Sequence, residues 1–294
     1  MSSIRHDQAH RPAFETPAMG ASPKRGWASR GTLSIVIPAK DEAANLPRLL
    51  EEVALAFRPL VGRSGGLHPL AAFEVVVVDD GSTDPTGDVL RDLAWLYPEL
   101  RPVALSRNVG QSAATVAGFR ASRGEWVGML DADLQNPPAS LARMWDVLPG
   151  YDAALGWREK REDSRTKRLT SRLANRVRNA VLGQAVRDTG CSVRILRREL
   201  ALRLPMFRGG HRFLGPLLIR EGCRIVQMPV GHRPRAHGKS HYHFGNRSLR
   251  VVVDLLGVAW LLRRPVDYEV IPTEMPATIP LGLASGRVAE RARS

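Results

Sequence analysis

Two carboxylates and a carboxamide follow one short apolar run in the middle of the chain. Asp131, Asp133 and Gln135 come directly after residues 125–130, which we expect to form a buried strand. Carboxylate and amide oxygens are hard donors, so three of them this close suit Mg²⁺ or Mn²⁺ better than a soft metal. Because a D-x-D pair also occurs in turns and helix caps, its neighbours have to decide between these uses.

Two further polar clusters stand at the ends of expected strands. The runs 33–37 and 73–78 are rich in β-branched residues, and they lead into the clusters 38–42 and 79–84. We expect Asp41 to cap the helix that follows the first cluster. Strands and helices alternate with short connections, which predicts an α/β fold with a doubly wound, mostly parallel sheet flanked by helices. The three clusters then face one crevice at the carboxyl edge of the sheet.

Composition narrows the class of protein. The chain has 294 residues, 44% of them hydrophobic, which is enough for one large α/β domain with an extension. Its formal net charge of +14 indicates an anionic partner, whether nucleic acid, a membrane surface or a phosphorylated small molecule. The two cysteines lack C-x-x-C spacing, which argues against a zinc site. No G-x-G-x-x-G or P-loop pattern follows a strand.

The two ends of the chain differ in texture from its centre. Residues 1–30 are expected to be a disordered basic leader, and 265–294 a flexible tail. The longest apolar run, 251–262, is shorter than the roughly 20 residues of a spanning helix. We expect amphipathic helices over 165–182 and 247–264, placed at a membrane interface or packed on the domain with a solvated basic face.

Several motifs occur in an order that resembles a known family. They are the clusters named above, Arg107-Asn108-Val109-Gly110, Gly156-Trp157-Arg158, the run from Asp188 to Arg194, and Arg235-x-x-Gly238-x-Ser240. In this order the chain resembles the inverting family 2 glycosyltransferases, and within them the polyprenyl-phosphate sugar synthases, such as dolichol-phosphate mannose synthase. The resemblance implies a GT-A type domain over 31–246, followed by an amphipathic membrane-interface helix over 247–264.

The resemblance also implies roles for individual residues. The nucleotide-binding residues would be Pro38, Asp41, Glu42, Asp79 and Asp80. Asp131, Asp133 and Gln135 would hold the divalent cation on the donor diphosphate. The acceptor phosphate would meet Lys167, Ser171, Arg194, Arg235 and Ser240, and the residues of the catalytic step would be Asp133, Arg158 and Arg235.

The reaction implied is transfer of a hexose from a GDP- or UDP-sugar to a polyprenyl phosphate, undecaprenyl or dolichyl, with inversion. Such a phosphate is already an anion, so it can attack without a general base, and arginine and lysine side chains have to gather it. We expect a peripheral enzyme on the cytoplasmic face of the membrane, bound to anionic lipid and served by a separate membrane protein.

Two alternatives remain open on the sequence. The same fold could transfer sugar to a hydroxyl on a glycan, lipid or protein, although no Q-x-x-R-W follows Asp133. A basic nucleic-acid-binding protein would explain the charge, but acidic clusters at strand ends repel phosphate unless a cation intervenes. The chain also lacks a recognisable nucleic-acid-binding motif, so we expect no nucleic-acid partner.

Overall fold

A computed structural model of the protein describes residues 31–63, 68–159, 176–183, 186–234 and 247–264, the last range with side chains from 251 onward. The helices and strands belong to one compact unit, Met1–Arg263, while the unit Arg264–Ser294 is described only at its first residue. The expected leader 1–30 and tail 265–294 therefore lie outside the described residues.

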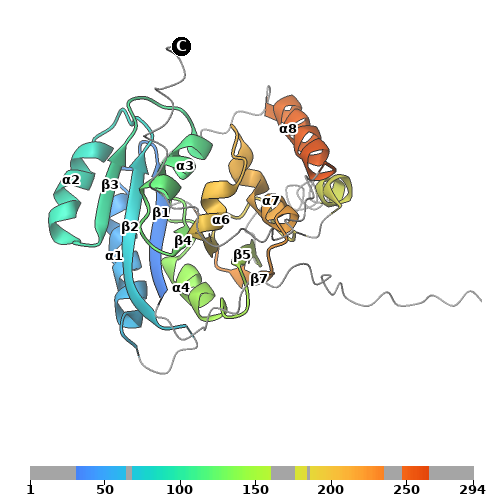
Figure 1. The fold of residues 1–294 in the computed structure, drawn as a ribbon. Helices are drawn as coiled ribbons and strands as arrows, with labels where there is room; N and C mark the ends of the chain where they lie inside the picture. The colour runs from blue at the N-terminus through green and yellow to red at the C-terminus, as the bar shows by residue number, and fades with distance from the viewer. Residues whose placement is uncertain (1–30, 64–67, 160–175, 184–185, 235–246, 265–294) are drawn as a thin grey trace, which may run out of the picture. The chain divides into compact units, whose positions relative to one another are not determined.

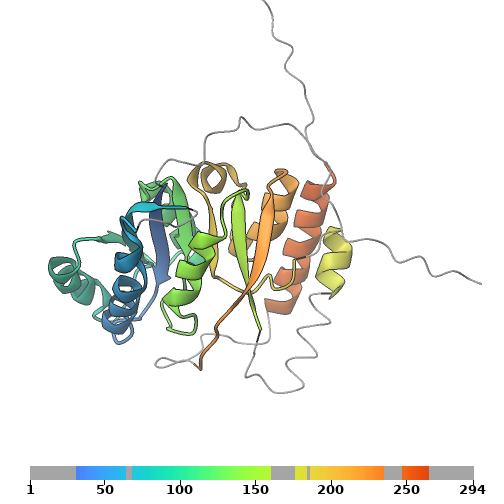
Figure 2. The same ribbon diagram turned by 90° about the horizontal axis from the view of Figure 1, so that it is seen from below.

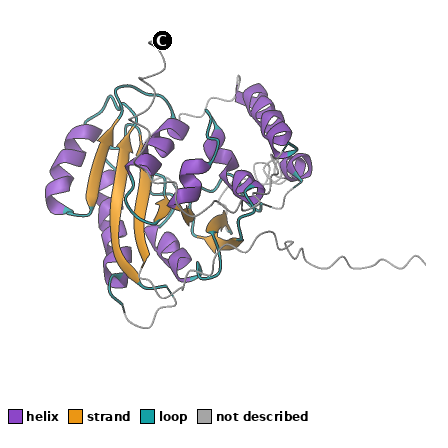
Figure 3. Cartoon of the chain, in the orientation of Figure 1, coloured by secondary structure: helices purple, strands orange, loops and turns teal. Residues whose placement is uncertain are grey.

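The strands of the described residues form one sheet in the order β3-β2-β1-β4-β6-β5-β7 (Figures 1 and 3). Neighbours are parallel except at β6, which runs antiparallel to both β4 and β5. The expected doubly wound, mostly parallel sheet is confirmed. Its strands are β1 (Gly31–Ala39), β2 (Leu70–Asp79), β3 (Leu100–Ala104), β4 (Trp126–Met129), β5 (Ala153–Arg158), β6 (Arg194–Arg197) and β7 (Ile225–Val230).

Helices cover both faces of the sheet, as Figures 1 and 2 show from two directions. Alternate residues of a strand point to opposite faces, so Ile35 and Val75 enter one core cluster while Val36 and Val76 enter the other. The first cluster joins α1 (Leu46–Phe57), α2 (Thr86–Leu96) and α4 (Pro138–Asp146). The second joins α3 (Gln111–Ala121), α6 (Arg198–Arg203), α7 (Leu214–Arg220) and α8 (Arg247–Leu262). Two 3₁₀ turns, η1 (Arg58–Leu60) and η2 (Gly210–Phe213), complete the set, and residues 176–182 are also helical.

The prediction that Asp41 caps the first helix is wrong. Helix α1 begins at Leu46 after Asn45, and no side chain caps it. Asp41 instead has a φ of 56°, in the left-handed region that residues other than glycine rarely adopt. This turn directs its carboxylate to the loop after β2, where backbone amides bind it.

No helix in the described part of the chain combines the length and the apolar character that crossing a bilayer requires.

A buried histidine makes the stability of the fold depend on pH. His68 is 6% exposed, and its ring stacks on Trp145 with the centroids 4.2 Å apart. Burial, and then the charge of Arg197, lower the pKa of His68 from its usual 6.5. The unfolded chain therefore takes up a proton at a higher pH than the native protein does. Acidification below about pH 6.5 favours unfolding, by at most about 1.4 kcal/mol per pH unit for one such group.

We predict that the His68→Phe variant, which keeps an aromatic ring on Trp145, loses less stability than the wild type between pH 7.5 and 5.5. Urea unfolding at several pH values measures the difference. Parallel stability curves for the two proteins would contradict this role of His68.

Candidate active site

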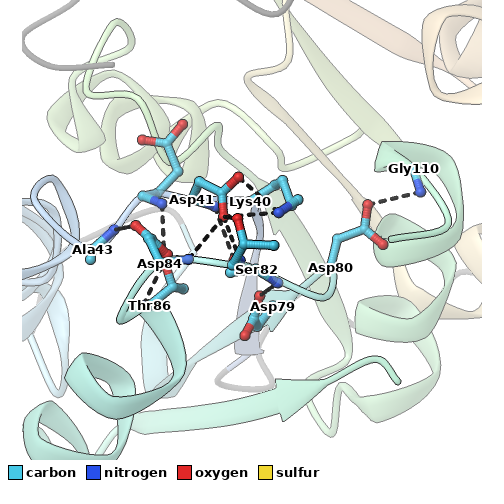
Figure 4. A network of polar contacts seen from close by, with 11 residues as sticks. Lys40, Asp41, Ala43, Asp79, Asp80, Ser82, Asp84, Thr86 and Gly110 are labelled. Carbon is cyan, nitrogen blue, oxygen red and sulfur yellow. Dashed lines mark hydrogen bonds and ion pairs between the residues drawn. The ribbon is translucent and has the colours of Figure 1, made fainter. Parts of the chain in front are cut away.

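The loops that follow β1 and β2 are joined by hydrogen bonds to one carboxylate (Figure 4). Asp41 accepts from the backbone amides of Thr83 and Asp84, at 2.7 and 3.3 Å, and from the ammonium of Lys40 at 2.8 Å. Its own amide donates to the hydroxyl of Ser82. The contact with Lys40, and then the two amides, lower the pKa of Asp41 to about 2. The side chain is therefore a fixed negative charge at the sheet edge.

A second set of contacts ties the same loops in the opposite direction. Asp84 accepts from the amide of Ala43 at 3.1 Å and from both the amide and the hydroxyl of Thr86. The amide of Glu42 donates to the Thr86 hydroxyl at 3.0 Å, and the Glu42 carboxylate accepts from Asn45. The loops after β1 and β2 thus form one rigid edge.

The paired aspartates at the end of β2 hold backbone. Asp79 accepts from the amide of Ser82 at 2.9 Å, which closes the turn after the strand. Asp80 accepts from the amides of Val109 and Gly110, one on each carboxylate oxygen and both at 2.8 Å. Because Gly110 directly precedes α3, Asp80 fixes the start of that helix.

Gly81 explains why the aspartate pair is followed by glycine. Its φ of 62° lies in the left-handed region, and a Cβ there would come within 2.4 Å of the carbonyl carbon of Arg107 and 2.5 Å of the amide nitrogen of Asn108. The close approach that the glycine permits is therefore that of the 107–110 loop.

The carboxylates after β4 lie next to the start of α3. The amide side chain of Gln111, the first residue of α3, donates to Asp131 at 3.0 Å. Asp133 is 6% exposed and accepts from the backbone amide of Gln135 at 3.2 Å. Leu134, between them, has a left-handed φ of 61°. Burial, and next the neighbouring charge of Asp133, raise the pKa of Asp131.

This arrangement suits a cation that completes its coordination with oxygens from a ligand. Two carboxylates close enough to raise a pKa repel each other, and a divalent cation between them removes that cost. Among the described residues, no three His, Cys, Asp or Glu side chains converge on one point. A hard cation such as Mg²⁺, which keeps several sites for water or phosphate, fits such an incomplete donor set.

The carboxamide of Gln135 is also engaged by the protein. Its nitrogen lies 3.5 Å from the carbonyl of Arg233, and the Arg233 amide donates to the Gln135 carbonyl at 2.8 Å. These contacts connect the loop after β4 to the loop after β7, which begins at Gly231.

Strand β6 brings an arginine to the same sheet edge. Because β6 is antiparallel, its first residue, Arg194, pairs with Met129 at the end of β4 and with Leu155 of β5. Arg194 is 4% exposed and donates to the carbonyls of His211 and Thr189, at 2.8 and 2.9 Å. Burial lowers the pKa of its guanidinium, while nearby carboxylates, Asp131 among them, oppose that change.

Arg158, at the end of β5, forms a two-pronged ion pair with Asp188. The N–O distances are 2.7 and 3.0 Å, and the side chains are only 15% and 8% exposed. Both Arg158 and Arg194 lie near enough to Asp131 to lower its pKa in part. Positive and negative side chains are therefore layered within one half-buried site.

The structure adds residues that the sequence reasoning did not single out. Asp188, which holds Arg158, stood inside a quoted motif, and Gln111 follows another directly. Arg178 contacts the hydroxyl of Thr189. Ser112 lies 2.7 Å from the imidazole of His211 and shows no motif signal in the sequence.

Of the expected site residues, four fall outside the described residues: Lys167, Ser171, Arg235 and Ser240. Pro38, in β1, pairs in register with Val78 of β2 and is partly exposed. The remaining expected residues lie at the carboxyl ends of β1, β2, β4 and β5 or at the start of β6. Their individual roles stay predictions.

Comparison with protein families matches one family model. The model of glycosyl transferase family 2 matches residues 34–204, which is more than half of the chain.

Two curated relatives have names that mention polyprenyl phosphates. The undecaprenyl-phosphate 4-deoxy-4-formamido-L-arabinose transferase of Pseudomonas paraeruginosa is 39% identical over 227 residues, 76% of this chain and 64% of the relative. The dodecaprenyl-phosphate galacturonate synthase of Rhizobium johnstonii is 33% identical over 261 residues, 86% of this chain and 72% of the relative. The chain spans just under two thirds of the length of the first relative.

Solved structures share the fold. A mannosyltransferase from Pyrobaculum calidifontis, in complex with GDP-Man and Mn²⁺, superposes with a TM-score of 0.52 at 23% identity, over 69% of this chain and 56% of that one. Glucosyl-3-phosphoglycerate synthase from Mycobacterium tuberculosis, with Mn²⁺, UDP and phosphoglyceric acid, gives 0.57 at 23% identity over 78% of each chain. The expected GT-A type fold is confirmed.

We predict that Asp80→Asn lowers the free energy of unfolding by about 1–3 kcal/mol. Asparagine has one acceptor oxygen, so its amino group faces a backbone N–H of Val109 or Gly110 and leaves a buried donor without a partner. The control is Asp92→Asn, an exposed aspartate on α2 that we expect to change stability by less than about 0.5 kcal/mol. Urea unfolding compares the two, and equal midpoints would show that Asp80 does not anchor α3.

Proposed function

The chain belongs to glycosyl transferase family 2, and from this premise we propose that it transfers a hexose from a nucleotide-diphosphate sugar to a polyprenyl phosphate. The names of relatives that are 39% and 33% identical support this acceptor class. The observation that carries the proposal is the layering of Asp131 and Asp133 against the buried Arg194 and Arg158. One sheet edge thus offers groups for a metal-bound diphosphate and for a second anion.

On the donor side, the rigid edge after β1 and β2 would receive the nucleotide, with Pro38, Asp41, Glu42, Asp79 and Asp80. Asp41 is held as a fixed charge and can accept hydrogen bonds from a base or ribose. Mg²⁺ or Mn²⁺ would be held by Asp131, Asp133 and Gln135, and when bound it neutralises the charge that develops on the leaving diphosphate. The two solved neighbours described above were crystallised with Mn²⁺ and a nucleotide or nucleotide sugar.

On the acceptor side, a phosphate oxygen of the polyprenyl phosphate would attack C1 of the sugar, with inversion. The anion needs no general base, so the protein has to attract it and aim it. Arg194 and Arg158 are the described candidates, joined by Lys167, Ser171, Arg235 and Ser240 from outside the described residues. Because Asp188 holds Arg158 in place, the guanidinium needs little reordering when a phosphate arrives.

We also propose that the protein works on an anionic membrane surface, at its cytoplasmic face, with α8 as the contact. Val252, Val253, Leu256 and Trp260 of α8 are 50%, 59%, 59% and 59% exposed. Their spacing places them on one side of the helix, and the exposed Arg263 follows at its end. An exposed apolar stripe with an arginine beside it fits a helix lying in the lipid headgroup region. A separate membrane protein would be a further partner.

We predict that Asp133→Asn lowers the transfer rate by about 10²–10³-fold, because the cation on the leaving diphosphate supplies several kcal/mol. Asparagine keeps the oxygen that accepts from the Gln135 amide, so we expect the fold to survive. The assay follows label from UDP- and GDP-sugars into an organic-soluble product, with Mg²⁺, Mn²⁺ or EDTA. Asp92→Asn serves as the control, and a fully active Asp133→Asn variant in EDTA would contradict the proposal.

The acceptor class is tested in the same assay. We expect wild-type protein to label polyprenyl phosphate and to leave polyprenol and free sugars unlabelled. Labelling of a hydroxyl acceptor in place of the phosphate would assign the second activity considered from the sequence. A thermal-shift panel of UDP- and GDP-sugars with Mn²⁺ identifies the donor, since a ligand that binds only the native state raises Tm.

We predict that the double variant Val253→Asp/Leu256→Asp binds phosphatidylglycerol vesicles at least tenfold more weakly than the wild type. The matched control is Leu55→Asp/Leu96→Asp on α1 and α2, at positions that are 70% and 71% exposed. Co-sedimentation with vesicles measures the difference. Equal loss in both double variants would indicate a general effect of charge and would contradict a specific role for α8.

A further inference from the structure

An apolar groove lies beside α8, away from the carboxylates of the sheet edge. Its volume is about 370 Å³, and its walls include Val181 and Leu182 of the helical segment 176–182, Ile219 of α7, and Ala259 and Leu262 of α8. Arg263 is the charged residue among those that line it. Figures 1 and 2 both show this segment, coloured yellow, running next to α8.

We propose that this groove binds the part of the acceptor's isoprenoid chain nearest to its phosphate. The inference rests on the proposed function and extends it from the phosphate to the hydrocarbon. A volume of about 370 Å³ is at the lower end of the roughly 300–1,000 Å³ of small-molecule sites, so it suits a short stretch of chain. Branched, uncharged isoprene units match walls of valine, leucine, isoleucine and alanine.

The groove is connected to the cationic side of the site by its own helix. Arg178 lies three and four residues before Val181 and Leu182, so the three share one side of the helix. Along the axis the separation is roughly 4.5–6 Å. Arg178 contacts Thr189, and the charges of Asp188 and Arg212 both act on it. A phosphate held among these arginines would have its first isoprene units within reach of the groove.

The other end of the groove is continuous with the exposed apolar stripe of α8. Trp260 of the stripe is the neighbour of Ala259, which lines the groove, and Leu256 precedes Ala259 by three residues. A chain that leaves the groove therefore passes directly to the face proposed to contact lipid. The hydrocarbon stays covered along this route, first by protein and then by the bilayer.

The test fills the groove without disturbing the core. Ala180 lines the groove and is exposed, so tryptophan can be placed there without overpacking buried residues. Val177, on the same helix, is 50% exposed and is absent from the lining, so Val177→Trp is the matched control. Melting temperatures close to wild type establish that both full-length variants fold.

Equilibrium binding of two probes, farnesyl phosphate and isopentenyl phosphate, is measured without any sugar donor. We expect the wild type and Val177→Trp to bind the longer chain at least tenfold more tightly than the shorter one, and Ala180→Trp to lose that preference while still binding isopentenyl phosphate. Unchanged farnesyl phosphate binding in Ala180→Trp would overturn the groove assignment.

A third probe, dodecyl phosphate, separates an isoprenoid site from a site for straight acyl chains. Displacement of farnesyl phosphate by an equal concentration of dodecyl phosphate would assign the groove to phospholipid chains and overturn the proposal. Because binding is measured directly, an absence of sugar transfer to polyprenyl phosphate would count against the proposed function and leave the groove result standing.

Discussion

The organisation of this site depends on the bond between one buried carboxylate and two backbone amides. Asp80 binds the amides of Val109 and Gly110, and through them it fixes where α3 begins. Gln111, the next residue, reaches Asp131 at the end of β4. The polar groups after β2 and after β4 are thereby held in one frame. A charged acceptor makes stronger hydrogen bonds than a neutral one, and at 4% exposure this carboxylate competes little with water.

A second constraint comes from the reversal of one strand. In an all-parallel sheet, residues at the start of a strand lie at the edge away from the ligand crevice. Strand β6 runs the other way, so its first residue, Arg194, lies beside the last residues of β4. The reversal places a buried cation next to two carboxylates without any long loop. It also explains why the basic half of the site is built from residues about 60 positions later in the chain than Asp131.

Charge in this site is balanced locally. Asp188 pairs with Arg158, two carbonyls hold Arg194, and the mutual repulsion of Asp131 and Asp133 is left for a cation to relieve. Burying ionised groups is costly unless each has partners, and this layered arrangement supplies them. The net charge of +14 indicated an anionic partner but gave no sign of this pairing. Composition counts charges, whereas pairing depends on which side chains the fold brings within 3 Å of one another.

The sequence alone determined the alternation of strands and helices, the parallel core of the sheet, and the presence of acidic clusters at strand ends. It could do so because these features depend on local patterns: β-branched runs make strands, prolines and glycines end them, and the carboxyl ends of parallel strands share an edge. Tertiary structure decided what the polar side chains do there. Asp41 left its expected helix cap for amides 42 and 43 residues away, the glycine after Asp80 admitted a protein loop, and Arg158 found Asp188. Each of these contacts joins segments far apart in the chain, so its geometry depends on the packed sheet and is absent from any local pattern.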